Sequence, residues 1–334
     1  MATRIGEDDS SATTLLAIRW GVAFGVLLLA FAGTVVTLNA TLYSAAGFVS
    51  SYLDSLARHD LEGALAMPGV EHPSDALPDL LVADGLGRLT SYELVSDEAD
   101  GDGHTLRFDV HFAGDIRSEI EFTVEHTGHR MGVFSGWRFT RSPIGVLQAT
   151  PLHAADFEVN GVAVTSADGA NQPSRYQVMT PGIYTLTHQS KYLQAEPATF
   201  LAEGSASITE AQLDIQASQE FVDQVSTELA AYLDDCAAQQ VLLPTDCPFG
   251  KTMNNRIEGP PEWSIAVYPE VTIVPSPDEG GVWLVQPTPA AAHLTVQVKS
   301  LFDGSVSTFD EDVPFDVEYT ITFPGDGTLL ITPR

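Results

Sequence analysis

The sequence predicts a mixed α+β protein. It has an N-terminal membrane-spanning helix, then two domains that each combine a helix with an antiparallel sheet, and a small β module between these two domains. Three observations predict this architecture. Residues 20–38 are apolar and uncharged, two segments carry apolar residues at helical spacing, and several others alternate apolar with polar residues as half-buried strands do. With 334 residues, 44% of them hydrophobic, the chain is long enough for two or three cores.

The N-terminal apolar segment, "WGVAFGVLLLAFAGTVVTL" at residues 20–38, is close to the roughly 20 residues that a helix needs to cross a bilayer. Arg4 and Arg19 precede it, and the next basic residue is Arg58. Because basic residues stay on the cytoplasmic side, we expect residues 1–19 to be a cytoplasmic leader and the rest to be exported. A cleaved signal peptide is the alternative, with "SAA" at residues 44–46 as a cleavage site, but the apolar run is longer than such peptides usually carry.

A linker at residues 39–47 leads to the first predicted domain, residues 48–147. Its opening helix has a single apolar face, and Pro68 and Gly69 end the helical segment. A second, shorter helical piece is predicted over residues 77–89, with Ser74 as its cap. The residues of the apolar face are Phe48, Val49, Tyr52, Leu53, Leu56, Leu61, Ala64 and Leu65.

Alternating strands follow in "TLRFDVHF", "SEIEFTVEH" and "MGVFSGWRFT", and "AGDI" supplies the first turn. We expect the apolar residues of these strands to face the core and the charged residues to pair across the solvent face. The inward set is Leu106, Phe108, Val110, Phe112, Ile120, Phe122, Val124, Val133, Trp137 and Phe139. The outward set is Arg107, Asp109, His111, Glu119, Glu121 and Glu125.

The segment "VSSYLDSLARHDLEGALAM" resembles the opening helix of NTF2-like (cystatin-like) domains of exported actinobacterial proteins, over residues 48–147. This resemblance implies a cone-shaped sheet closed by helices. The family includes isomerases and dehydratases that use acids or histidines inside the cone, and also members without known activity. His59 and Asp60 interrupt the helical pattern, so a site at the cone mouth is the candidate for an enzyme of this kind.

The predicted β module spans residues 151–205. "FEVNGVAVT" predicts two strands joined by an Asn160-Gly161 turn, and "YQVMTPGIYTLTHQS" predicts two more around Pro181-Gly182, with positive φ at Gly182. The "PG-x-Y-x-L" strand resembles PEGA-like surface modules of bacterial envelope proteins. The resemblance implies a spacer or a contact surface.

The second α+β domain is predicted over residues 210–334, and its helix followed by a hairpin-rich sheet suggests a second NTF2-like (cystatin-like) cone related to the first. Its helix begins near Phe221, and strands follow in "WSIAVYP", "VWLV", "HLTVQVKSL", the alternation from Val313 to Phe323, and "TLLIT" after an Asp326-Gly327 turn. The apolar helix positions are Phe221, Val222, Val225, Leu229, Tyr232, Leu233 and Cys236.

The only two cysteines, Cys236 and Cys247, are too far apart for a C-x-x-C redox motif, and no further ligands lie near enough for a zinc site. Outside the cytoplasmic membrane thiols are commonly oxidised, so we expect a disulfide. The stretch "CAAQQVLLPTDCPFG" also resembles an element of uncharacterised actinobacterial single-pass membrane-anchored envelope proteins, a resemblance that brings no assigned chemistry.

The net charge and the short motifs of the sequence argue against several classes of partner and binding site. The formal net charge of −30 makes nucleic acid and anionic lipid headgroups poor partners. "DEADGDGHT" at residues 97–105 lacks calcium-loop spacing and is interpreted as a polar hairpin loop, and "HTGH" at residues 126–129 is placed in a turn. No metal site and no cofactor is expected.

The sequence therefore favours a membrane-anchored, extracytoplasmic, non-catalytic binding or scaffold protein of the cell envelope. It would bind an envelope protein or a cell-wall component through the cone mouths or exposed strand edges. Two alternatives stay open: an NTF2-like enzyme with a site at His59 and Asp60, and a surface sensor.

Overall fold

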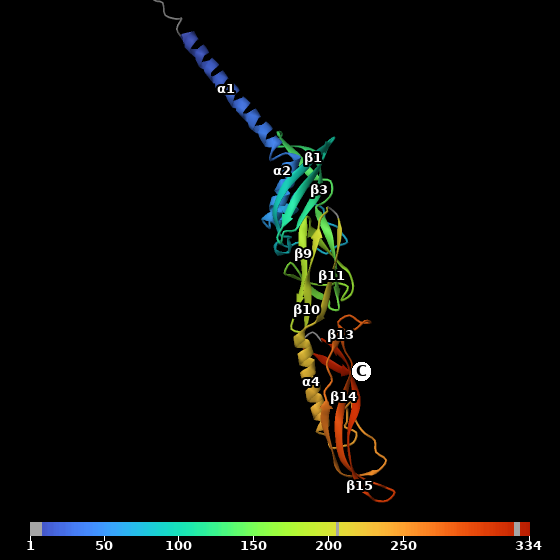
Figure 1. Ribbon diagram of the computed structural model, residues 1–334. Helices are drawn as coiled ribbons and strands as arrows, with labels where there is room; N and C mark the ends of the chain where they lie inside the picture. The colour runs from blue at the N-terminus through green and yellow to red at the C-terminus, as the bar shows by residue number, and fades with distance from the viewer. Residues whose placement is uncertain (1–8, 205–206, 324–327) are drawn as a thin grey trace, which may run out of the picture. The chain divides into compact units, whose positions relative to one another are not determined.

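The computed structural model describes residues 9–204, 207–323 and 328–334. The described chain is a mixed α+β protein made mostly of sheets, with few helices and one apolar helix at the N-terminus (Figure 1). It divides into two compact units. Unit 1 comprises Met1–Leu147, Gln177–Tyr184 and Leu201–Thr209, and unit 2 comprises Gln148–Tyr176, Thr185–Phe200 and Glu210–Arg334. The domain ranges drawn from the sequence stay predictions.

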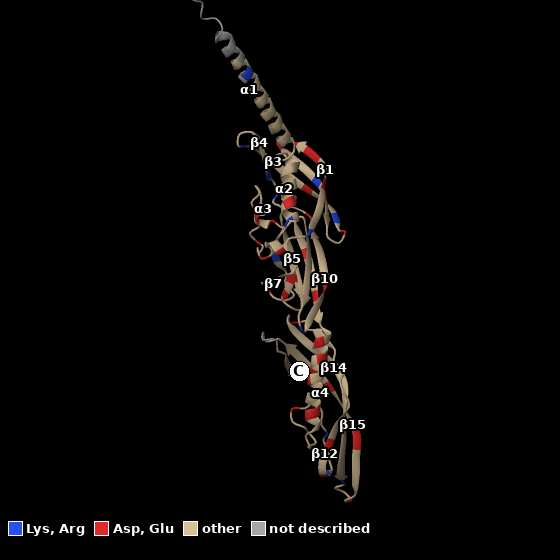
Figure 2. Cartoon of the chain, turned by 90° about the vertical axis from the view of Figure 1, so that its left-hand side faces the viewer, with Lys and Arg blue, Asp and Glu red and all other residues tan. Residues whose placement is uncertain are grey.

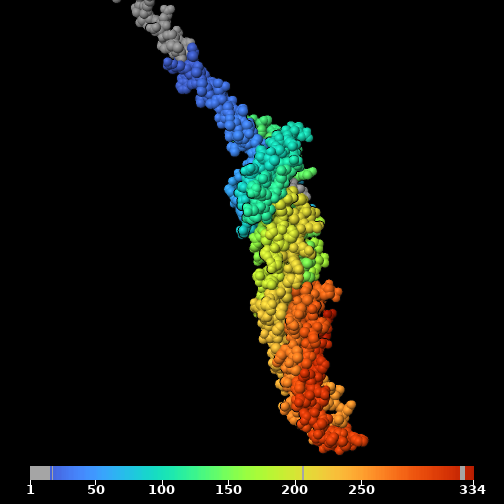
Figure 3. Space-filling view, in the orientation of Figure 1, coloured from blue at the N-terminus to red at the C-terminus, as the bar shows by residue number. Residues whose placement is uncertain are grey.

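Helix α1 extends from Asp9 to Ala40, and of the predicted leader, residues 1–8 lie outside the described residues. Its part Ile18–Ala40 has a mean hydropathy of 2.2, and none of its most apolar window is buried inside the protein. Figure 3 shows α1 standing away from the folded part of unit 1. The helix is long and apolar enough to cross a membrane, a property that an anchor and a signal sequence share.

Two short helices follow in unit 1, α2 at Ala45–Ala57 and α3 at Leu61–Leu65. Ser44 caps α2 by accepting a hydrogen bond from the Gly47 amide at 3.0 Å. The predicted apolar face is confirmed in α2, where Val49, Tyr52, Leu53 and Leu56 are buried.

The helical piece predicted over residues 77–89 is wrong. The structure has one 3₁₀ turn, η1 at Ala83–Gly85, and Leu89 already belongs to a strand. The Leu77 carbonyl accepts a hydrogen bond from the Gln177 amide at 2.7 Å, which ties this segment to a strand of unit 1 rather than to a helical turn. The apolar residues at near-helical spacing therefore pack individually and not as one helix face.

A four-stranded antiparallel sheet packs against α2, in the order β1 (Leu89–Asp100), β2 (Gly103–Phe112), β3 (Arg117–Arg130) and β4 (Phe134–Phe139). The inward alternation is confirmed in β2 and β3. Residues 97–105 form a tight hairpin around Gly101, as expected, although most of them belong to β1 and β2. The buried strand residues are Leu106, Phe108, Val110, Phe112, Ile120, Phe122, Val124 and Phe139.

Two details of the third and fourth strands differ from the prediction. His126 and His129 lie within β3 and not in a turn, because a bulge between His126 and Gly128, with Gly128 at φ 102°, lets the strand continue. The turn comes later, and Val133 belongs to it rather than to the inward face of β4.

The middle of the chain forms a seven-stranded sheet in the order β7-β6-β9-β10-β11-β5-β8. The expected Asn160-Gly161 turn is confirmed, with φ values of 52° and 85°. The strands are β5 (Ile144–Leu152), β6 (Asp156–Val159), β7 (Val162–Thr165), β8 (Ser174–Met179), β9 (Gly182–Gln189), β10 (Leu193–Ala202) and β11 (Ile208–Ala217).

The connection at Pro181-Gly182 differs from the expected turn. It joins β8 to β9, which are not neighbours in the sheet, the Thr180–Pro181 bond is cis, and the φ of Gly182 is not positive. Glycine is needed here for space, because a Cβ atom at Gly182 would lie 2.9 Å from the Met179 carbonyl oxygen and 2.9 Å from the Tyr184 side chain.

Unit 2 contains the predicted helix, α4 (Gln219–Ala237), with the expected buried face, and the sheet order is β12-β14-β15-β16 with β13 beside β14. "VWLV" and "HLTVQVKSL" are one strand, because β14 passes the intervening prolines through a bulge between Val285 and Thr288. The Asp326-Gly327 turn lies outside the described residues. The strands are β12 (Arg256–Val267), β13 (Ile273–Pro275), β14 (Val282–Lys299), β15 (Val306–Thr322) and β16 (Leu330–Pro333).

Candidate functional site

The disulfide expected from the sequence is present. The sulfur atoms of Cys236 and Cys247 are 2.06 Å apart, and the two Cα atoms are 5.8 Å apart. Cys236 is the last buried residue of α4, so the bond fastens the loop after the helix to the helix end. The Trp263 indole N–H also holds this loop by donating to the Val241 carbonyl at 2.8 Å.

The site predicted at the mouth of the first cone consists of His59 and Asp60, which lie exposed between α2 and α3. Asp60 caps α3, since its carboxylate accepts a hydrogen bond from the Gly63 amide at 2.9 Å. His59 has a φ of 57°, as suits the residue that reverses the chain between two helices. Neither side chain lines the tyrosine-lined cavity beside α4 or the hollows beside Arg141, Lys251 and Trp137.

The interior of unit 1 is occupied by apolar side chains. Tyr52 contacts the rings of Phe122 and Phe139, with centroid distances of 6.0 and 5.3 Å. Its hydroxyl donates to the Thr180 carbonyl at 2.6 Å and to the Pro143 carbonyl at 3.3 Å. Burial raises the pKa of Tyr52 well above its usual value, so the hydroxyl stays protonated. Through these buried hydrogen bonds, Tyr52 links α2 to the segments that contain Pro143 and Thr180.

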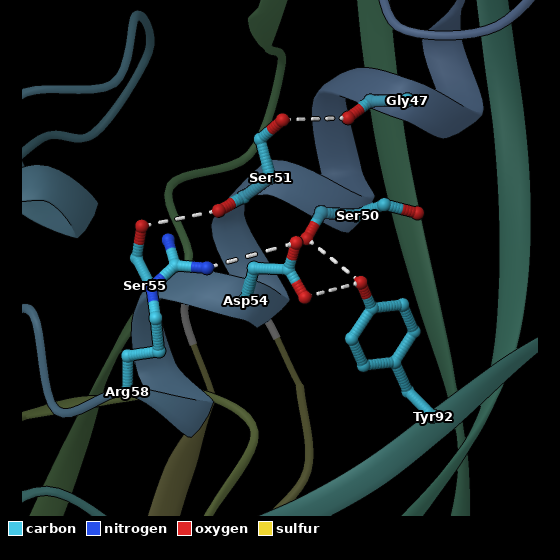
Figure 4. Close-up of polar contacts among 7 residues, drawn as sticks. All are labelled: Gly47, Ser50, Ser51, Asp54, Ser55, Arg58 and Tyr92. Atoms are coloured by element: carbon cyan, nitrogen blue, oxygen red, sulfur yellow. Dashed lines mark hydrogen bonds and ion pairs between the residues drawn. The ribbon is translucent and has the colours of Figure 1, made fainter.

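A polar cluster lies on α2 and β1, near the predicted cone mouth (Figure 4). The Tyr92 hydroxyl donates to Asp54 Oδ1 at 2.7 Å and to the Ser50 carbonyl at 3.1 Å. Arg58 lies 3.9 Å from the same carboxylate. Burial and the Asp54 hydrogen bond raise the pKa of Tyr92 to about 12, so it is a hydrogen-bond donor and not a proton-transfer group near neutral pH. The cluster joins the helix to the edge strand.

The charged strand faces carry ion pairs. Arg107 and Glu121 face each other across β2 and β3 at 3.4 Å, as the alternation predicts. His293 on β14 lies between Asp312, at 2.8 Å, and Asp310, at 2.5 Å. These hydrogen bonds, first that to Asp312 and then that to Asp310, raise the pKa of His293. Among the described residues no group of three or more His, Cys, Asp or Glu side chains has an arrangement suited to a metal ion.

Three of the cavities each belong to a single unit, two of them to unit 1 and one to unit 2. A polar one of about 210 Å³ lies beside Glu119, Glu121 and Arg141, and one of about 340 Å³ lies beside Lys251 and Phe309. The third, of about 240 Å³, lies beside Tyr43 and Trp137.

The remaining cavity, of about 250 Å³, lies between α4 and strands β15 and β16 of unit 2. Its Tyr319 and Tyr232 hydroxyls are hydrogen-bonded to each other, and that of Tyr232 donates to the Asp246 carbonyl in the disulfide-bonded loop. Burial, followed by the neighbouring Tyr232, raises the pKa of Tyr319 to about 12, so both hydroxyls are neutral near pH 7. We name this cavity the tyrosine groove, and its lining residues are Val225, Glu228, Leu229, Tyr232, Tyr319, Ile331 and Pro333.

No protein-family model matches the chain, and no curated protein and no solved structure is significantly similar to it.

The tyrosine groove was not predicted as a site from the sequence. Tyr232 and Tyr319 were both placed on buried faces, as ordinary core positions; Tyr319 is buried, whereas Tyr232 is only half-buried. A signal was present, since a tyrosine on a buried face needs a partner for its hydroxyl. The hydrogen-bond partner of Tyr232 on the loop is Asp246, which lies 14 residues later and is held in place by the disulfide of the neighbouring Cys247. The cysteine pair was therefore the sequence feature that lay nearest to the groove.

Proposed function

We propose that this protein is a single-pass, membrane-anchored, extracytoplasmic protein of the bacterial cell envelope that binds a partner and performs no catalysis. Helix α1 would be the anchor, with the N-terminus in the cytoplasm because Arg4 and Arg19 precede the apolar segment and no basic residue follows before Arg58. The disulfide is compatible with an oxidising, extracytoplasmic location.

The observation that carries the proposal is that the residues directly after α1 are part of the folded unit 1. Cleavage after Ala46 would remove Ser44, which caps α2, and Ala45, which is 1% exposed. It would also remove Tyr43, whose carbonyl accepts a hydrogen bond from the Trp137 indole at 2.8 Å. A signal peptide is normally dispensable to the mature fold, so these contacts favour a retained anchor over a cleaved one.

We further propose that unit 1 contains an NTF2-like domain and that the following strands include a PEGA-like module, as in actinobacterial envelope proteins of this architecture. The support is the packing of α2 and α3 on a four-stranded antiparallel sheet, and the Asn160-Gly161 hairpin. Because Tyr52 and its aromatic neighbours fill the interior of unit 1, a binding role fits this domain better than the acid-base chemistry of catalytic members of the family.

The tyrosine groove is the proposed binding surface, and its occupant is an apolar segment of a partner protein. Val225, Leu229 and Ile331 supply apolar walls. The neutral tyrosine hydroxyls add hydrogen-bonding capacity that an apolar segment with backbone amides can use. Glu228 is exposed at the groove, which suits a partner with a basic residue beside its apolar one.

Site-specific photo-crosslinking in intact cells tests this function. A photoreactive amino acid at Glu228 should yield a discrete crosslinked product, whereas the same group at Thr227, which is also exposed on α4 but does not line the groove, should not. Ile331→Glu places a charge in the groove and should remove the product at Glu228, provided that circular dichroism shows an intact fold. Equal crosslinking at both positions, or none at Glu228, contradicts the groove as a binding site.

A further inference from the structure

The hairpin between β3 and β4 is fastened to the end of α1. The Asn39 side chain donates to the Val133 carbonyl at 2.8 Å and accepts from the Ser135 amide at 2.9 Å. The rings of Tyr43 and Phe134 stack with a centroid distance of 4.4 Å. Three consecutive residues of the hairpin end are therefore held at the level where the apolar helix stops.

The tip of this hairpin presents an apolar side chain and a cation to solvent. Met131 is 93% exposed, which is unusual because methionine is among the residue types most often buried in folded proteins. Arg130 beside it is exposed, and within the described residues its guanidinium makes no hydrogen bond and no ion pair. The tip is thus free to contact something other than the protein.

A pocket of about 240 Å³ opens next to the tip, and we name it the juxtamembrane pocket. Its walls come from the turn after α1, from α2 and α3, and from β3 and β4, so it belongs entirely to unit 1. The lining is mixed, with somewhat more apolar than polar surface and with Arg130 as its one basic side chain. The lining residues used below are Leu42, Tyr43, Phe48, Met67, Arg130 and Trp137.

We propose that the juxtamembrane pocket and the hairpin tip bind a phospholipid of the outer leaflet, with its phosphate at Arg130 and the start of an acyl chain against Tyr43, Phe48 and Trp137. The inference rests on the proposed anchoring by α1. The apolar part of α1 ends at Ala40, and Leu42 already lines the pocket. Because the headgroup layer extends about 5–7 Å beyond the hydrocarbon core, the pocket lies within that layer. Tyrosine and tryptophan are enriched there, and an arginine is suited to a phosphate.

The charges around the juxtamembrane pocket determine which lipid headgroups it can bind. Asp100 and Asp102 lie at the β1–β2 turn, on the same end of the sheet as the β3–β4 turn. This end of the sheet therefore does not carry a polybasic patch, in agreement with the formal net charge of −30. It should not attract anionic membranes in general. The contact uses one phosphate and apolar groups, so a zwitterionic phospholipid should bind as well as an anionic one.

Fluorescence quenching in nanodiscs measures the depth of the tip. Both native cysteines are in the disulfide, so the full chain with Met131→Cys carries one free thiol for a fluorophore. In phosphatidylcholine nanodiscs with a spin label near the headgroup, the label at position 131 should be quenched. The control is Ala113→Cys, which is exposed at the β2–β3 turn on the opposite end of the same sheet and should not be quenched.

Native mass spectrometry of the detergent-solubilised full chain measures the lipid itself. Wild type should retain one added phosphatidylcholine, and Arg130→Gln should weaken this binding about tenfold or more, as expected for the loss of one charge-assisted hydrogen bond. Arg117→Gln is the control, because Arg117 is exposed at the other end of β3. An excess of inorganic phosphate should leave the lipid bound, and its displacement would show a site for free phosphate instead.

The outcomes separate this inference from the proposed anchor. If the chain fails to float with vesicles, the anchor itself is refuted. If it floats but the label at position 131 is no more quenched than that at 113, or if Arg130→Gln binds the lipid like wild type, the lipid site is refuted while the anchor stands.

Discussion

At the scale of single residues, the hydroxyl of Tyr52 links segments of the unit 1 core that are far apart in the sequence. Tyr52 is fully buried, and its hydroxyl reaches carbonyls of Pro143 and Thr180, which follow it by 91 and 128 residues. Because both acceptors also lie in unit 1, the hydrogen bonds join α2 to segments of the same unit that are distant in the sequence.

Removal of this hydroxyl should destabilise unit 1. Tyr52→Phe leaves the Thr180 carbonyl without its donor, which costs about 1–3 kcal/mol for a buried unsatisfied group. Hydrogen exchange of the β2 and β3 amides should report faster opening. Tyr43→Phe is the control, since the Tyr43 hydroxyl makes no hydrogen bond within the described residues. Equal exchange in both variants would show that the Tyr52 bond contributes nothing.

His293 should make the stability of unit 2 depend on pH. Its pKa in the folded protein is raised above 6.5 by Asp312 and Asp310, so the folded state holds a proton more tightly than the unfolded state. This stabilisation is fully present below pH 6.5 and is lost as the pH rises through the folded pKa. Denaturant unfolding should show a decline over this window that His293→Gln flattens and that the exposed His59→Gln preserves. A decline that persists in His293→Gln contradicts this assignment.

Residue roles were predictable where they depended on local alternation. The burial of Phe108 and Phe122 and the Arg107–Glu121 pair follow from the period of two in their strands. The partners of Tyr52 and Tyr232 were not predictable, because nothing local in the sequence identifies which carbonyl will meet a buried hydroxyl.

At the scale of elements, the helices and strands with one buried face were predicted well. Helix α4 has its apolar residues at the expected spacing and begins at Gln219, directly after Ser218, whose side chain caps it. Strand β1 was missed, since only its first residue, Leu89, is buried. An edge strand exposed on both faces has no alternation to detect.

The long strand β14 shows a second limit. Pro287 and Pro289 suggest a break, because proline donates no hydrogen bond to a neighbouring strand. The structure keeps one strand by placing a bulge between Val285 and Thr288, and β15 stays paired on both sides of it. Proline patterns thus predict an irregularity here, but not whether the strand ends.

At the scale of the whole molecule, charge and hydropathy differ sharply between helix α1 and the rest of the chain. Asp and Glu residues are spread over the strands and α4 (Figure 2), and the formal net charge is −30, whereas the most apolar window of α1 has no buried residue. In the proposed anchoring, the acidic surface would keep the folded units in water, and the exposed apolar helix would lie in lipid. This difference is the physical basis of the proposed anchoring.

Accessibility of a C-terminal tag in intact cells tests this central claim most directly. The account predicts that the tag is reached by a membrane-impermeant protease or label without lysis, while an N-terminal tag is protected and remains on the same full-length membrane-bound chain. A C-terminal tag that is protected until the cells are lysed would contradict the extracytoplasmic assignment. Release of the C-terminal part without the N-terminal tag would show that α1 is a cleaved signal and not an anchor.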